Sequence, residues 1–64
     1  MKPLEITTFG ASLAEARARF FDELEAAQIR DRCEYYPIRT TAEHDSEGVC
    51  ITSFLIDAAK MGEV

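Results

Sequence analysis

The spacing of apolar side chains changes twice along this chain, and each spacing predicts one kind of element. From Leu4 to Phe9, apolar and polar residues alternate, which is typical of a β-strand. Gly10 and Ala11 then interrupt the pattern. From about residue 13 to residues 29–31 the period becomes helical, with an apolar stripe made by Leu13, Ala16, Phe20, Leu24 and Ala27.

The start of this helix carries a second signal. Ser12 and Glu15 have the spacing of a capping box, in which each side chain bonds a free backbone N–H of the first turn. Arg17 interrupts the apolar stripe. One interpretation is that its aliphatic part packs against the sheet while its guanidinium reaches water. The other is that it contacts a partner, since arginine is enriched at binding hot spots.

The second half of the chain predicts two strands joined by a tight turn. Residues 33–41 are rich in aromatic and β-branched side chains, and Pro37 places this strand at a sheet edge because proline cannot donate to a ladder. Asp45 and Gly48 bound a four-residue turn. Residues 49–56 are apolar on both faces, as in a central strand. Residues 57–64 extend this strand, form one helical turn or fray.

These elements predict a single α+β domain over residues 1–64. Its order is β-α-β-β, with one helix packed on a three-stranded antiparallel sheet of order 1-3-2. A turn that sets Asp45 opposite Val49 divides the hairpin into two faces. The face expected beneath the helix contains Cys50, Thr52, Phe54, Ile56, Tyr36 and Ile38.

One helix covers only one face of a sheet, so the other face is expected to be open. It contains Val49 and four candidate partner-binding residues, which are Tyr35, Arg39, Ile51 and Leu55. Exposed apolar patches with polar rims tend to mark interfaces. The patch then binds a second copy or a foreign partner, or the C-terminal tail covers it, or it is ordinary apolar surface.

Charge narrows the classes of partner. The 64 residues carry a formal net charge of −5, most of it after residue 32, and the few cations are dispersed. This disfavours direct binding to nucleic acid or to anionic membranes and fits a basic protein surface. Without a secretory leader or a long apolar run, and with Cys33 and Cys50 as free thiols, we expect a cytoplasmic protein.

Three acids gather at the predicted hairpin tip. They are Glu43, Asp45 and Glu47, with His44 between the first two. One interpretation is a solvated turn, since turns favour polar residues. The other is an acidic prong that imitates phosphates and binds the lysines and arginines of a partner.

Catalytic, metal and cofactor signals are absent from the sequence. The single histidine and two separated cysteines do not supply a metal set, and the isolated glycines form no phosphate loop. His44 and Cys50 face each other in the predicted register, which offers the one starting point for an enzyme with a shared interface site. We therefore expect neither a cofactor nor an enzyme.

The stretches T-F-G-A-S-L-A-E-A-R (8–17) and E-H-D-S-E-G-V-C-I-T-S (43–53) join a strand to a capped helix and form a tight hairpin. In size, acidity and topology the chain resembles small anti-CRISPR proteins of phages and mobile elements. The resemblance implies a non-catalytic inhibitor that occupies a nucleic-acid or partner surface of a CRISPR effector, in the host cytoplasm. It carries over no functional residue, because these proteins share no binding motif. The alternative hypothesis is a homodimeric accessory domain.

Overall fold

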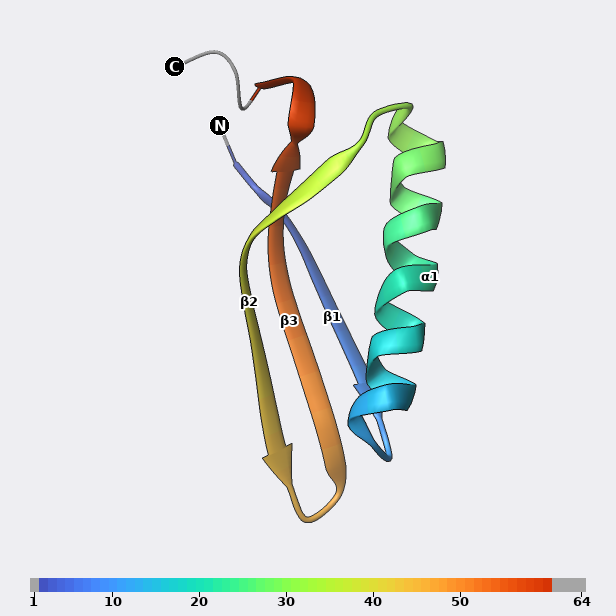
Figure 1. Cartoon of the computed structure of the whole chain (residues 1–64), viewed down its shortest axis with the longest axis vertical. Coiled ribbons are helices and arrows are strands. Elements are labelled where there is room, and N and C mark those ends of the chain that lie inside the picture. Colours follow the sequence, from blue (N-terminus) through green and yellow to red (C-terminus); the bar gives the residue numbers. More distant parts are fainter. Residues whose placement is uncertain (1, 61–64) are drawn as a thin grey trace.

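A computed structural model describes residues 2–60 and confirms the predicted α+β fold. Its elements are β1 (Leu4–Gly10), α1 (Leu13–Asp31), β2 (Tyr35–Asp45) and β3 (Gly48–Asp57), followed by a single 3-10 turn (Ala58–Lys60). The strands form an antiparallel sheet in the order β1-β3-β2, and α1 lies along one face of it (Figure 1). The tail thus forms a helical turn, and its last four residues lie outside the described part of the chain.

The ends of α1 are set by local hydrogen bonds. Ser12 has extended backbone angles, and its Oγ accepts from the Glu15 N–H at 3.2 Å, so the predicted N-cap is confirmed. The reciprocal half of the capping box does not form, because the Glu15 carboxylate pairs with Arg19 instead. At the other end Arg32 adopts a left-handed conformation (φ 53°), and its N–H donates to the carbonyl of Gln28.

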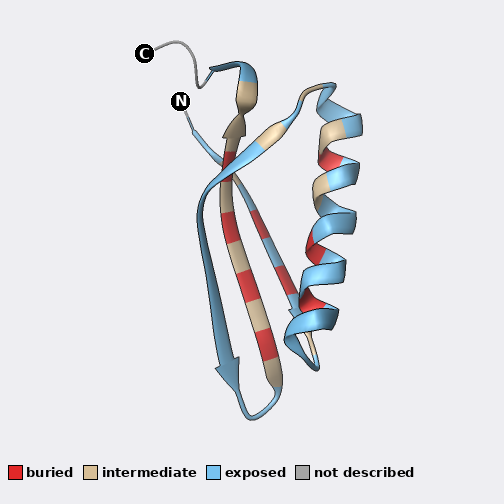
Figure 2. Cartoon of the chain, viewed as in Figure 1, coloured by how far each residue is buried: buried red, intermediate tan, exposed pale blue. Residues whose placement is uncertain are grey.

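The core lies between α1 and the inner face of β1 and β3. Its buried residues are Ile6, Ala16, Phe20, Val49, Ile51 and Leu55. Thr8 is also buried, and its hydroxyl donates to the Ala16 carbonyl at 2.9 Å, which fixes the first turns of the helix against β1. Along β3, buried and half-buried residues alternate, as Figure 2 shows in red and tan bands.

The prediction of which sheet face the helix covers was wrong. Ile51 is 4 % exposed and Leu55 is 0 % exposed, so both lie beneath α1 and neither can contact a partner. Tyr35, which was expected to be on the open face with them, also packs against the core. The face expected beneath the helix, with Cys50, Thr52, Phe54 and Ile56 on β3, is the open one.

Two features of β2 explain part of this error. The turn holds two residues rather than three, so that Asp45 pairs with Gly48, and Arg39 rather than Thr40 is set opposite Phe54. Between Pro37 and Arg39 the register then shifts by one residue, so that Pro37 is opposite Leu55 and Tyr36 is opposite Ile56. In the register set by the turn, Thr40 is opposite Ser53 and faces inward, where its hydroxyl lies 2.9 Å from the hydroxyl of the fully buried Ser53.

The helix covers only part of the sheet. It packs mainly on β1 and β3, so that β2 lies at its edge and is almost wholly exposed (Figure 2). The edge position predicted from Pro37 is confirmed. The β2–β3 hairpin also extends past the first turn of α1, so its tip is free of the helix (Figure 1).

Candidate functional site

The tip of the β2–β3 hairpin is closed by one of its own acids. Oδ1 of Asp45 accepts hydrogen bonds from the N–H groups of Glu47 (2.7 Å) and Gly48 (3.1 Å). Gly48 has a φ of 143°, a backbone conformation that residues with a Cβ rarely adopt. Asp45 therefore forms the turn, whereas the exposed Glu43 and Glu47 side chains are the acids of the tip that make no hydrogen bond within residues 2–60.

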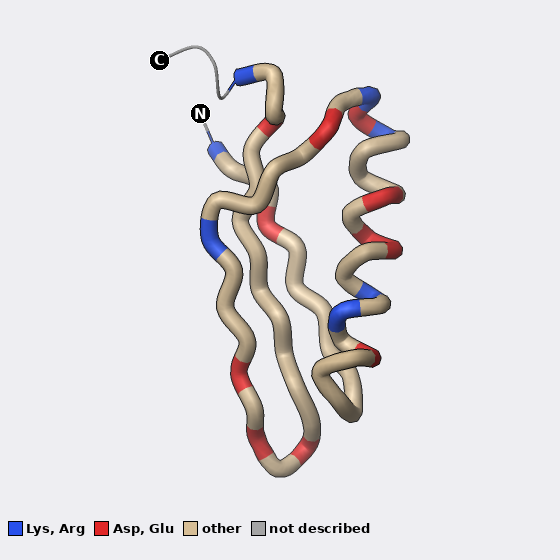
Figure 3. The backbone as a smooth tube through the Cα atoms, in the orientation of Figure 1, with Lys and Arg blue, Asp and Glu red and all other residues tan. Residues whose placement is uncertain are grey.

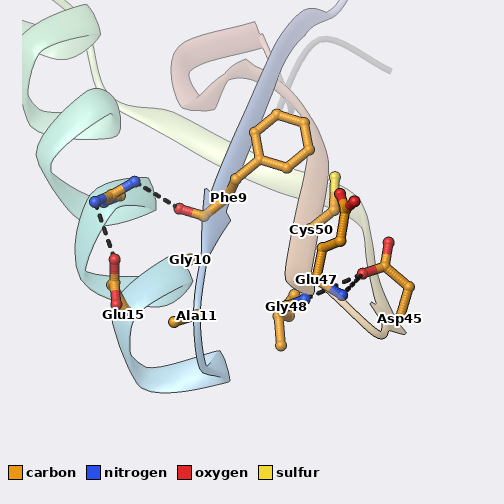
Figure 4. A pocket seen from close by; sticks show the side chains of 10 residues that line it. Phe9, Gly10, Ala11, Glu15, Asp45, Glu47, Gly48 and Cys50 are labelled. Atoms are coloured by element: carbon orange, nitrogen blue, oxygen red, sulfur yellow. Dashed lines mark hydrogen bonds and ion pairs between the residues drawn. The ribbon is translucent and has the colours of Figure 1, made fainter.

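A shallow hollow of about 340 Å³ lies between this tip, the end of β1 and the start of α1. Figure 4 shows its wall, to which Phe9, Glu15, Asp45, Glu47 and Cys50 contribute side chains. Phe9 is 62 % exposed, which is unusual for a phenylalanine and leaves its ring open to a ligand. The hollow thus combines an aromatic surface with carboxylates.

The charges around the hollow are not balanced. Arg19 pairs with Glu15 at 2.9 Å and also donates to the carbonyl of Phe9 at 3.0 Å, so its charge is already engaged. Asp45 and Glu47 have no basic partner among residues 2–60. An uncompensated pair of carboxylates beside an exposed ring suits a lysine or arginine side chain, with its stem on the ring and its cation near the acids.

Two glycines bring these walls together. A Cβ on Gly48 would overlap the carbonyl oxygen of Gly10, and a Cβ on Gly10 would overlap the backbone nitrogen of Ala16. The end of β1, the start of β3 and the first turn of α1 therefore meet more closely than residues with side chains allow. Residue spacing alone did not reveal this contact, because these glycines are 38 positions apart in the chain.

Tyr35 has a different place from the one predicted. Its hydroxyl donates to Oδ2 of Asp31 at the end of α1, and Arg30 binds both oxygens of the same carboxylate. The Tyr35 N–H also donates to Oε1 of Gln28 at 2.9 Å. Tyr35 thus fastens the start of β2 to the helix, a structural role that the alternation pattern of the strand could not indicate.

These bonds shift the ionisation of Asp31. The hydrogen bond from Arg30 and then that from Tyr35 lower the pKa of Asp31 from 3.8 to about 2, and the bond to Asp31 raises the pKa of Tyr35. A lowered carboxyl pKa adds stability that is fully present above pH 4 and is lost as the pH falls toward 2.

Replacing Tyr35 with phenylalanine should therefore raise the pKa of Asp31 toward 3.8, because one of its two hydrogen-bond donors is lost. Carboxyl NMR shifts of Asp31 between pH 1.5 and 6 measure the change. Tyr36→Phe is the control, since Tyr36 lies on the other face of β2 and should leave the titration of Asp31 unaltered. An Asp31 that titrates near 3.8 in the unaltered protein would contradict the assignment.

The pairing of His44 with Cys50 does not occur. In the observed register Glu43 is opposite Cys50, and His44 is opposite Val49. His44 and Cys50 therefore lie on different faces of the sheet, and a histidine base is not beside the thiol. Cys33 and Cys50 are both free thiols.

The Arg17 side chain is exposed and makes no ion pair in the described region. Its guanidinium lies over the ring of Phe21, with 5.9 Å from Cζ to the ring centre, and both side chains are exposed. Beside them an apolar groove of about 240 Å³ runs between α1 and β2. Arg17 therefore lines the rim of a groove, which leaves its role as a contact residue a prediction.

Within residues 2–60, no group of three or more His, Cys, Asp or Glu side chains could hold a metal ion, and no helix in that range has the length and apolarity to cross a membrane.

Comparison with known proteins adds no family to this picture: no family model, curated protein or solved structure matches the chain significantly.

Proposed function

We propose that this chain is a small non-catalytic protein-binding domain that inhibits its partner by covering a basic surface with its hairpin tip. The observation that carries the proposal is the position of Glu43, Asp45 and Glu47 at a projecting tip, within a segment (residues 40–59) that has no lysine or arginine (Figure 3). Such a concentration of one sign of charge steers association with a surface of the opposite sign.

The mechanism is steric and electrostatic. A basic side chain of the partner enters the hollow beside the tip, where Asp45 and Glu47 supply negative charge and Phe9 supplies an apolar wall. Glu43 extends the acidic row along β2, so that several basic residues can be engaged at once. Residues that normally bind phosphates are then occupied by carboxylates, and nucleic acid or another acidic partner is displaced.

The resemblance to anti-CRISPR proteins supplies the narrowest hypothesis for the target. On that hypothesis the partner is a CRISPR effector, the tip occupies its nucleic-acid surface, and the protein works in the cytoplasm of a host cell. The acidity and topology of the chain support this hypothesis at the level of architecture alone.

Reversing Glu43 and Glu47 to lysine should weaken partner binding by at least tenfold, which corresponds to about 1.4 kcal/mol. Asp45 stays unchanged because it closes the turn. The matched control is Glu23→Lys with Glu25→Lys, which makes the same change in net charge on exposed positions of α1. Each protein is immobilised through its C-terminus, since the 3-10 turn that follows β3 lies at the end of the molecule opposite the tip (Figure 1).

The measurement has two stages. Cell lysate is first passed over the three immobilised proteins. A candidate partner is retained by the unaltered protein and by the control, but not by the tip variant, and it is eluted by salt. Purified species are then titrated, and a CRISPR effector among them is assayed for guide-directed DNA cleavage. Equal retention by all three proteins would show that the tip is not the contact.

A further inference from the structure

The open face of the sheet has an ordered arrangement of side chains, of which the proposed inhibitor uses only Phe9 and Glu43. Strand pairing aligns the outward residues of β1, β3 and β2 in cross-sheet rows, and these rows are Phe9–Cys50–Glu43, Thr7–Thr52–Thr41 and Glu5–Phe54–Arg39. Beyond them Ile56 is paired with Tyr36, whose side chain is 54 % exposed. The face is thus apolar or uncharged along its central strand and carries charge on its outer strands.

The row through Phe54 carries opposite charges at its two ends. Glu5 and Arg39 lie on either side of Phe54, two strands apart, and each points away from the helix. Neither forms an ion pair within residues 2–60, although Glu5 accepts a weak hydrogen bond from Thr7. Opposite charges that flank an apolar centre at the same level make the row complementary to a rotated copy of itself.

We propose that this face binds a second copy of the chain around a two-fold axis that runs along β3. Such an axis places β1 of each copy over β2 of the other and keeps every row at its own level. Glu5 then faces Arg39 of the second copy, Arg39 faces the second copy's Glu5, and the two Phe54 rings meet at the axis. Sheets pack face to face about 10 Å apart, a gap that these side chains span.

The charges select this axis over the other face-to-face arrangement. An axis across the strands at the same row would stack Glu5 on Glu5 and Arg39 on Arg39, and like charges in opposition disfavour association. The axis along β3 also places both hairpin tips at the same end of the dimer. The pairing of β1 with β3 ends at Gly10 and Val49, so Glu47 in the turn lies beyond the rows that meet in the dimer.

The size of the face sets the expected strength. Three strands about 4.8 Å apart, paired over seven residues of β1, give a smaller contact than a standard protein interface. We therefore expect a dimer with a dissociation constant in the micromolar range, which is populated at high concentration and dissociates on dilution.

Charge exchange across the proposed interface tests the proposal by sedimentation between about 5 and 500 µM. Glu5→Arg alone and Arg39→Glu alone should each weaken the dimer at least tenfold, because each sets like charges face to face. The double variant, which carries both changes, should dimerise like the unaltered protein, and an equimolar mixture of the two single variants should form a heterodimer. Glu25→Arg on α1 is the control and should leave dimerisation unchanged.

Circular dichroism of each variant at low concentration shows that it is folded. The proposal is overturned if the unaltered protein remains a monomer at 500 µM, or if Arg39→Glu dimerises as strongly as the unaltered protein, as pairing through the free edge of β1 would allow. Neither outcome depends on the hairpin tip, so this test is separate from that of the proposed inhibitor.

Discussion

Leu55→Ala is expected to destabilise the protein by about 2 to 5 kcal/mol, whereas Ile56→Ala should cost about 1 kcal/mol or less. The two residues are neighbours on β3, but Leu55 is 0 % exposed beneath α1 and Ile56 lies on the open face. Truncating Leu55 leaves a cavity in a small core that has few other large side chains to close it.

A domain of 64 residues has a total stability of only about 3 to 10 kcal/mol. Leu55→Ala therefore removes a large share of it and should shift the urea midpoint markedly. Unfolding is followed by circular dichroism at low micromolar concentration, where self-association through the open face is negligible. If Ile56→Ala proved the more damaging of the two changes, the helix would have to cover the opposite face of the sheet.

Gly48→Ala is expected to be the second most damaging change, at about 1 to 3 kcal/mol for the backbone conformation alone. At a φ of 143° any residue with a Cβ is strained, and this Cβ would also overlap the carbonyl oxygen of Gly10. The turn has to shift away from β1, which separates the walls of the hollow at the tip.

The matched control for Gly48→Ala is Ser46→Ala in the same turn, since Ser46 is exposed and its side chain makes no hydrogen bond within residues 2–60. Urea unfolding should distinguish the two variants, and amide NMR shifts of Gly10 and Ala11 should move only for Gly48→Ala. A Gly48→Ala variant as stable as the unaltered protein would mean that the two strands are not in close contact.

Element types and topology followed from the sequence because each depends on local patterns. The period of residues 13–31, the cap at Ser12 and the proline in β2 predicted the helix, its first residue and the edge position of the strand. The sheet order then followed from the apolar character of β3 on both of its faces.

The covered face was not predictable from the same patterns, because β3 offers the helix two apolar faces of similar quality. The choice depends on the length of one turn and on one bulge in β2, and each changes which side chains of β2 join which face. With a two-residue turn, Arg39 and Glu43 share the face of Phe54, and the smaller Thr40 and Ala42 face the helix. That charge distribution is the signal that could have identified the covered face.

The candidate site was predictable only where its residues are close together in the sequence. The acids of the tip lie within five residues of the sequence, so their position at a turn could be predicted, but the turn-closing role of Asp45 depends on backbone geometry. Phe9, Arg19 and Glu15 come from the first third of the chain and reach the tip only through the tertiary fold.

The pairing of β1 with β3 also determines the order in which the parts of the sheet can fold. The hairpin joins near neighbours, but β1 is paired with residues 39 positions away at Gly10 and Val49 and 51 positions away at Leu4 and Leu55. Contacts of this separation form slowly because a long loop must close first. During synthesis the buried side of Ile6 therefore has no strand to join until β3, whose Ser53 lies 47 positions later, has left the ribosome.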